Sequence, residues 1–142
     1  MADYRCKNRS NYFRVLDEEK YQKIVSRMSS SDGYFETGKK ERDGQLHHNF
    51  VCEGQIMYVP EGWEEDCDED EAIGQFYEDI QQILPDDEAV IITKIGHEKL
   101  CYLTGFATVI TKNQVEHLDI WDLAEEKAGQ ILGRPFRADT CY

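Results

Sequence analysis

The sequence lacks the features of a membrane or secreted protein. No apolar run approaches the roughly 18 residues that a membrane-spanning helix needs. The first five residues contain no apolar stretch of the kind that forms the centre of a secretory signal. The five cysteines are odd in number, widely spaced and without a CxxC pair, so they do not have the pattern of a disulfide framework. These absences predict a cytoplasmic protein that keeps free thiols and has no membrane partner.

The sequence also lacks the short motifs of common enzyme classes. No Walker loop, GxSxG or HExxH occurs, and we therefore predict no catalytic residue and no cofactor. His47 and His48 precede Cys52, but adjacent residues of a strand point to opposite faces, so the two imidazoles do not converge on one zinc ion. A pairing of Cys101 with His117 stays open, because the sequence does not tell which side chains meet in space.

Length and composition indicate one folded domain over residues 1–142. Domains typically contain about 100–200 residues, and this chain has 142, of which 40% are hydrophobic. Its net charge is −13, from 29 Asp and Glu against 16 Lys and Arg. A phosphate surface would repel such a protein, which argues against direct binding to nucleic acid or to an anionic membrane.

The acidity is concentrated in one segment. Residues 53–88 contain 14 Asp and Glu and no Lys or Arg, and residues 64–71 hold seven carboxylates in eight positions. One interpretation is a solvated loop that keeps the protein soluble; the other is a negative patch that docks on a basic surface of a partner protein. On the second interpretation the partner-binding residues are Glu61, Glu64, Glu65, Asp66, Asp68, Glu69, Asp70 and Glu71.

Part of this segment has the spacing of a calcium loop. Asp66, Asp68 and Asp70 are spaced like the first three ligands of an EF-hand. The sixth position holds Glu71 where the sharp turn needs Gly, and the twelfth holds Tyr77 where a bidentate Glu belongs. We therefore predict no metal site.

The N-terminal half of the chain predicts strands around one helix. Asp17 is a suitable N-cap, and the apolar residues that follow it recur at helical spacing up to Met28. The dipeptide Glu53-Gly54 indicates a tight hairpin between two short strands. The predicted elements are a strand over 10–15, a helix over 17–28, a strand over 34–37, a charged loop over 38–44, and strands over 46–52 and 55–59.

The C-terminal half predicts two helices and a second group of strands. Residues 89–95 form a nearly continuous apolar run, typical of a central strand that is buried on both faces. Gly105 suggests a bulge in the partner strand, and Asp119 and Gly133 suggest the two ends of the last helix. The predicted elements are a helix over 70–84, a strand over 89–95, a turn over 96–99, strands over 100–110 and 115–118, a helix over 119–133 and a loose tail over 134–142.

Apart from the short strand over 34–37, the predicted elements as far as residue 95 follow the order strand, helix, strand, strand, helix, strand. This order predicts an α+β protein with the ferredoxin-like split βαβ arrangement, in which an antiparallel sheet carries its helices on one face. The remaining elements add an extra C-terminal strand and helix.

Two stretches of the chain resemble a known family. The segment Ser10–Val15 with the following Asp17–Glu19 resembles the opening of the YubB-like, ferredoxin-like small proteins of phages, plasmids and integrative elements. The segments 89–100 and 102–107 look like the strand, turn and strand of the same family. The resemblance covers about half of the chain. It implies a ferredoxin-like fold and a gene that is carried on a mobile genetic element. It implies no catalytic residues, and the acidic segment is not part of it.

These observations predict a non-enzymatic, acidic binding protein. We expect it to inhibit a nucleic-acid-handling defence system of the host, of the anti-CRISPR or anti-restriction type. Its carboxylates would occupy Lys and Arg sites that normally hold phosphates. The partner would be a basic protein surface, such as that of a nucleic-acid-binding enzyme. Two alternatives remain: an accessory or scaffold protein that self-associates through its sheet as a homodimer, and a small enzyme that depends on Cys or His.

Overall fold

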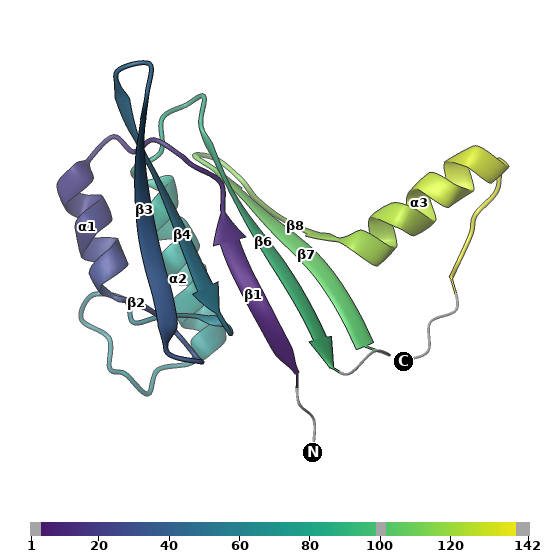
Figure 1. Ribbon diagram of the computed structural model, residues 1–142, viewed down its shortest axis with the longest axis horizontal. Coiled ribbons are helices and arrows are strands. Elements are labelled where there is room, and N and C mark those ends of the chain that lie inside the picture. The colour runs from purple at the N-terminus through teal and green to yellow at the C-terminus, as the bar shows by residue number, and fades with distance from the viewer. Residues whose placement is uncertain (1–3, 99–101, 139–142) are drawn as a thin grey trace.

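A mixed α+β fold is seen in the computed structural model, which describes residues 4–98 and 102–138 (Figure 1). Its main feature is a six-stranded antiparallel sheet with the strand order β3-β4-β1-β6-β7-β8. Two short strands, β2 and β5, form a separate antiparallel ribbon. The strands are β1 (Arg5–Ser10), β2 (Met28–Ser30), β3 (Tyr34–Arg42), β4 (Gln45–Glu53), β5 (Ile56–Tyr58), β6 (Ala89–Glu98), β7 (Tyr102–Thr111) and β8 (Val115–Asp119), and the helices are α1 (Glu18–Ser26), α2 (Glu69–Gln81) and α3 (Ile120–Leu132).

Helices α1 and α2 cover one face of the sheet and form the core with it (Figure 1). Three aromatic rings join the layers edge to face: Phe50 of β4 lies 6.2 Å from Phe13 and 6.3 Å from Phe76 of α2, between ring centroids. Such edge-to-face pairs are favourable beyond the apolar area that they bury. The other buried core residues are Tyr21, Ile24, Met28, Tyr58, Ile80, Ile83, Leu84, Val90, Ile92 and Ile110.

Each helix begins after an aspartate whose carboxylate accepts hydrogen bonds from the first turn. Asp17 accepts from the Lys20 backbone N–H at 3.0 Å, and Asp119 accepts from the Trp121 N–H at 2.8 Å. Helix α3 ends at Leu132, and the residue that caps its C-terminus is Gly133, which has a φ of 73°. These contacts satisfy N–H groups that have no partner within the helix, and they confirm the predicted caps. Helix α2 begins at Glu69, one residue before the predicted start.

The first strand was predicted wrongly over residues 10–15. β1 ends at Ser10, and the aromatic segment that follows leaves the sheet. Phe13 forms an isolated bridge with His48, with backbone N–O distances of 2.8 and 2.7 Å, and its side chain is fully buried. Phe13 therefore fills the core and Val15 packs against it, whereas Tyr12 is exposed, and the segment does not form a strand.

The predicted hairpin at Glu53-Gly54 is also wrong. β4 pairs with β1 and β3, whereas β5 pairs with β2. Gly54 has a φ of 86°, and a Cβ at this position would lie 2.8 Å from the Asp32 side chain. The glycine thus lets the chain leave the sheet beside the turn after β2. The predicted loop over 38–44 is mostly strand, because β3 continues to Arg42.

The two long C-terminal strands also differ from the predictions. β6 is central, but only one of its faces is covered, and Ile91 and Ile95 are 39% and 67% exposed. The predicted turn over 96–99 is strand as far as Glu98. The pairing of β6 with β7 runs without a bulge past Gly105. That glycine instead makes room for Ile120, whose Cγ2 would lie 3.0 Å from a Cβ at this position.

Helix α3 projects beyond the β8 edge of the sheet (Figure 1). None of its side chains is buried. Its first turn is held to β7 by a hydrogen bond from the Trp121 indole N–H to the Leu103 carbonyl oxygen at 3.4 Å. Of the predicted tail, residues 134–138 lie next to α3, where the Ala138 N–H donates to the Glu125 carboxylate at 3.1 Å; residues 139–142 lie outside the described residues.

Candidate functional site: an acidic-rimmed groove

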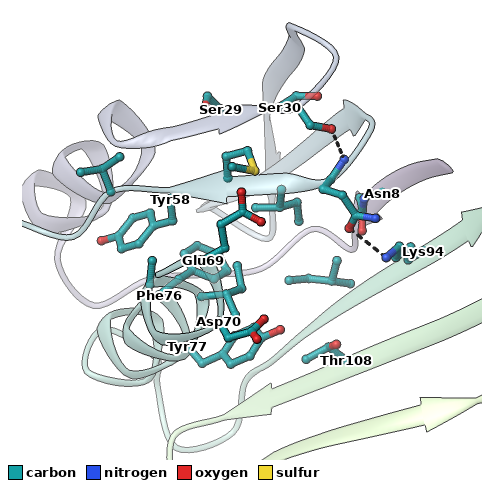
Figure 2. Close-up of a pocket in the computed structure, with 18 of the residues that line it drawn as sticks. Asn8, Ser29, Ser30, Tyr58, Glu69, Asp70, Phe76, Tyr77, Lys94 and Thr108 are labelled. Carbon is teal, nitrogen blue, oxygen red and sulfur yellow. Dashed lines mark hydrogen bonds between the residues drawn. The ribbon is translucent and has the colours of Figure 1, made fainter. Parts of the chain in front are cut away.

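A groove with a volume of about 1210 Å³ runs alongside α2 (Figure 2). The ribbon of β2 and β5 and the start of α2 form one wall, and β6, β7 and β8 form the other. Figure 2 shows Glu69 and Asp70 on the first turn of α2 and Lys94 across from them on β6. The groove therefore lies between a strongly acidic wall and the sheet.

The acidic rim of the groove consists of Glu65, Asp66, Glu69 and Asp70. The four belong to the eight predicted partner-binding residues, all of which are exposed. Of the other four, Asp68 caps α2 by accepting from the backbone N–H groups of Asp70 and Glu71 at 2.9 and 3.0 Å. Glu61 lies 3.6 Å from Arg27 Nη2, and Glu64 and Glu71 do not line the groove.

Elementary electrostatics favours the two rim carboxylates that belong to α2. The N-terminal end of a helix carries a partial positive charge and favours carboxylates in its first turn. Glu69, Asp70 and Glu71 occupy that turn in α2. Because residues 53–88 contain no Lys or Arg, no neighbour in the sequence neutralises these charges. The rim is therefore an exposed concentration of negative charge.

The floor of the groove is apolar and aromatic. Phe76 is fully buried, Tyr77 is half-buried, and Phe106 of β7 is 38% exposed. The Tyr77 ring lies 5.6 Å from the ring of His117, whose Nδ1 is 3.0 Å from the Thr108 hydroxyl. An apolar floor with a few polar groups is the usual make-up of a binding site.

The groove tyrosines are held in the neutral form. Burial raises the pKa of Tyr77. Burial also raises the pKa of Tyr58, and its hydrogen bond to the Asp79 carboxylate at 2.6 Å raises it further. A raised pKa favours the protonated phenol, which donates hydrogen bonds and is a poor general base at neutral pH. The Tyr58 hydroxyl is a neutral donor whose proton is already engaged by Asp79.

Lys94 is the single Lys or Arg among the described residues that line the groove. Its ammonium group donates to the Gln55 side-chain oxygen at 2.8 Å and lies 5.9 Å from the centroid of the Phe106 ring. The second contact is a cation–π arrangement, which stabilises the charge at a partly apolar position. This pair was not predicted from the sequence, because it depends on the register in which Lys94 and Phe106 are direct cross-strand partners.

The described buried cysteines do not have the properties of nucleophiles. Burial raises the pKa of Cys52 to about 11. Burial also raises the pKa of Cys6, although the charge of Lys94 opposes it. A reactive cysteine needs a lowered pKa, because the thiolate is the attacking species. Cys101, whose pairing with His117 the sequence leaves open, lies outside the described residues.

The adjacent histidines lie on opposite faces of β4. His48 is 1% exposed, its Nε2 lies 2.7 Å from a Glu18 carboxylate oxygen, and its ring packs on Tyr21 at 4.3 Å. The Nδ1 of His47 lies 3.0 Å from the Gln45 carbonyl oxygen. His48 is thus a core residue with a carboxylate partner. Within residues 4–98 and 102–138, no group of three or more His, Cys, Asp or Glu side chains is arranged to hold a metal ion.

Within the part of the chain that the structure describes, no helix combines the length and apolar character needed to cross a membrane. Comparison of the chain with protein-family models, with curated proteins and with solved structures finds no match.

Proposed function

We propose that the protein is a non-enzymatic binding protein whose acidic-rimmed groove takes a basic segment of another protein. The observation that carries this proposal is the position of Glu65, Asp66, Glu69 and Asp70 along one wall of an apolar groove. Arg and Lys side chains bind carboxylates with their charged ends and lay their apolar stems on hydrophobic surface. A basic segment therefore fits both parts of the groove.

The partner class that fits best is a nucleic-acid-handling enzyme. Such enzymes present rows of Lys and Arg to phosphates, and a dense row of carboxylates attracts the same side chains. By occupying those sites the protein would block the binding of nucleic acid. We propose an inhibitor of a host defence nuclease, of the anti-CRISPR or anti-restriction type, encoded by a mobile genetic element.

We also propose that the core of the molecule is a ferredoxin-like unit related to the YubB-like proteins. Its members would be β1, α1, β3, β4, α2 and β6, which follow the split βαβ order along the chain. The adjacency β6-β1-β4-β3 in the antiparallel sheet supports this assignment. The β2–β5 ribbon, β7, β8 and α3 would be additions to that unit.

Neutralising the rim tests the binding proposal. The test variant combines Glu65→Gln, Asp66→Asn, Glu69→Gln and Asp70→Asn. The control removes four charges elsewhere: Glu19→Gln, Glu41→Gln, Asp43→Asn and Glu78→Gln, all at exposed positions that do not line the groove. Binding of an Arg-rich peptide is measured by calorimetry at low and high salt. We expect the rim variant to lose at least about tenfold in affinity and the control to lose much less, because close charges contribute more than distant ones.

The same two variants test the inhibitor proposal. Plasmid cleavage by a panel of restriction nucleases and CRISPR effectors is measured with each protein added in excess. We expect the unmodified protein and the control variant to inhibit a member of the panel, and the rim variant not to inhibit it. Equal inhibition by the rim variant would show that another surface makes the contact.

A further inference from the structure

The side of the sheet opposite α1 and α2, here called the open face, carries an uncovered apolar surface on β6 and β7. Ile91, Ile95 and Leu103 are 39%, 67% and 51% exposed. Val109 and Gly105, the cross-strand partners of Ile91 and Ile95, continue the same apolar surface, and His97 lies opposite Leu103 at its end. Contiguous exposed apolar surface of this kind marks an interaction site in soluble proteins.

Two features indicate that this surface is covered in the functional protein. First, β6 has the nearly continuous apolar sequence of a strand with neighbours on both faces, and the single chain covers only one of them. Second, α3 lies at the edge of the same face, where Ile120 contacts Gly105, and buries none of its own side chains. Ile120, Leu123 and Ile131 are 59%, 46% and 76% exposed along α3. A 13-residue helix is marginal in water without tertiary packing.

The charges around the apolar surface are arranged in opposite signs on its two sides. On β1, Lys7 and Arg9 are exposed and alternate with the buried side chains, so they point to the open face. Lys7 Nζ lies 3.6 Å from a carboxylate oxygen of Glu53, its cross-strand partner on β4, so the two basic side chains outnumber the one acidic side chain paired with them. On the other side, Glu116 of β8 is an exposed residue of the open face, and Asp122 is exposed in the first turn of α3. Basic side chains on β1 and acidic side chains on β8 and α3 therefore flank the apolar surface of β6 and β7.

We propose that the open face and α3 form the interface of a homodimer. A two-fold axis that runs parallel to the strands between β6 and β7 places β1 of one copy opposite β8 and the start of α3 of the other. The strand registers put Arg9 level with Leu118 of β8, two residues from Glu116, and put Lys7 level with Gly105, which Ile120 contacts. The basic side chains of β1 in each copy thus face the acidic side chains of β8 and α3 in the other copy, and the two-fold symmetry makes this contact twice. The apolar surfaces of β6 and β7 pack on each other between these two contacts.

The charges also select this orientation over the other face-to-face one. A two-fold axis across the strands would place β1 opposite β1 and so bring Lys7 and Arg9 of both copies together. Like charges that face each other across an interface oppose association. Pairing through an exposed edge strand, β3 or β8, would leave the open face uncovered and would not depend on these four charges.

A charge-swap experiment tests the proposal. Variant A carries Lys7→Glu and Arg9→Glu, and variant B carries Glu116→Lys and Asp122→Lys. Sedimentation velocity at about 100 μM is expected to show a dimer for the unmodified protein. We expect A and B to be monomers separately, because in each variant the charges on β1 and those on β8 and α3 then have the same sign. An equimolar mixture of A and B should form a heterodimer. Circular dichroism checks that both variants are folded.

Two controls complete the test. Lys20→Glu with Lys23→Glu, at exposed positions of α1, makes the same change of charge away from the open face and should leave the dimer intact. Ile95→Asp should give a monomer, since it places a charge at the apolar centre. A monomeric unmodified protein overturns the proposal, and so does a dimer that persists in variants A and B. The rim of the groove is unchanged in all of these variants, so the outcome is independent of the proposed function.

Discussion

Helices α2 and α3 are the same length and begin in the same way, yet they differ completely in burial. Both contain 13 residues, and both follow an aspartate whose carboxylate caps the first turn. Helix α2 buries Ala72, Phe76 and Ile80 against the sheet, whereas α3 buries none of its side chains. The local sequence thus sets where a helix begins and ends, and the neighbouring elements set what it contributes to the stability of the fold.

The largest difference is expected from truncating one apolar side chain in each helix. Phe76→Ala should lower the free energy of unfolding by about 3–5 kcal/mol, because it leaves a cavity between α2 and Phe50. Ile131→Ala in α3 should change it by less than about 0.5 kcal/mol, since this side chain is 76% exposed. Urea unfolding at low protein concentration measures both. Equal losses would mean that α3 is packed in solution.

A second prediction concerns how the stability of the fold depends on pH. It rests on the Glu88 carboxylate, which lies between α2 and β6. Glu88 accepts hydrogen bonds from the Arg14 backbone N–H and guanidinium, each at 3.0 Å. Burial opposes its ionisation, but these hydrogen bonds and the charge of Arg14 prevail and lower its pKa below 4.5. The stabilisation is therefore complete above the pKa of the unfolded chain and is lost as the pH falls through the lower pKa of the folded protein.

Glu88→Gln measures this contribution. At neutral pH it should cost about 1.5–3 kcal/mol, the usual range for hydrogen bonds to charged groups. The variant should also lose less stability than the unmodified protein between neutral pH and pH values below 4.5. Glu78→Gln, at an exposed position of α2, is the matched control. Parallel pH profiles for the unmodified protein and Glu88→Gln would contradict the assignment.

Removing the N-cap aspartate of each helix should give a smaller difference between α2 and α3. Asp68→Ala should lower the global free energy of unfolding by about 1 kcal/mol, because α2 is part of the cooperative core. Asp119→Ala removes the same kind of contact from α3, and there it should increase local opening only. Amide hydrogen exchange, with protection measured helix by helix, separates the two cases. A global effect of Asp119→Ala would show that α3 unfolds together with the core.

The smallest effect is kinetic and concerns the thiols. Cys67, just before α2, is half-buried, whereas Cys6 and Cys52 are buried with raised pKa values. In a mild excess of iodoacetamide, peptide mapping by mass spectrometry should find Cys67 alkylated before the other two. If Cys52 reacts first, the core around β4 opens more readily than its burial indicates.

Helix starts were the part of the fold that the sequence predicted well; α1 and α2 end at Ser26 and Gln81, before the predicted Met28 and Leu84. Asp17 and Asp119 predict helix starts because their side-chain oxygens can accept hydrogen bonds from the free N–H groups of a first turn. Both predictions are confirmed. The acidic segment was equally visible, because charge can be counted without a structure. Its relation to the groove was not visible, since the opposite wall comes from three strands that follow much later in the chain.

Strand β1 was missed for a physical reason. Its inward-facing residues are Cys6, Asn8 and Ser10, so it has no hydrophobic alternation to detect. The polar pair is satisfied by distant backbone: Asn8 donates to the Gly54 carbonyl oxygen at 2.8 Å, and the Ser10 hydroxyl accepts from the Phe50 N–H at 2.9 Å. Buried polar groups are tolerated when they are hydrogen-bonded, and these partners cannot be read from neighbouring residues.

The central place of β1 has a consequence for the order of folding. On one side β1 pairs with β4, and on the other with β6, where Arg9 lies opposite Thr93. During synthesis, β1 leaves the ribosome long before β6 exists, so one of its backbone edges has no native partner until about 80 more residues have been made. Contacts so distant in sequence close slowly. The nascent chain therefore carries β1 without its β6 partner for most of its translation. Chaperones that shield unpaired strand edges should increase the fraction of chains that reach the native state.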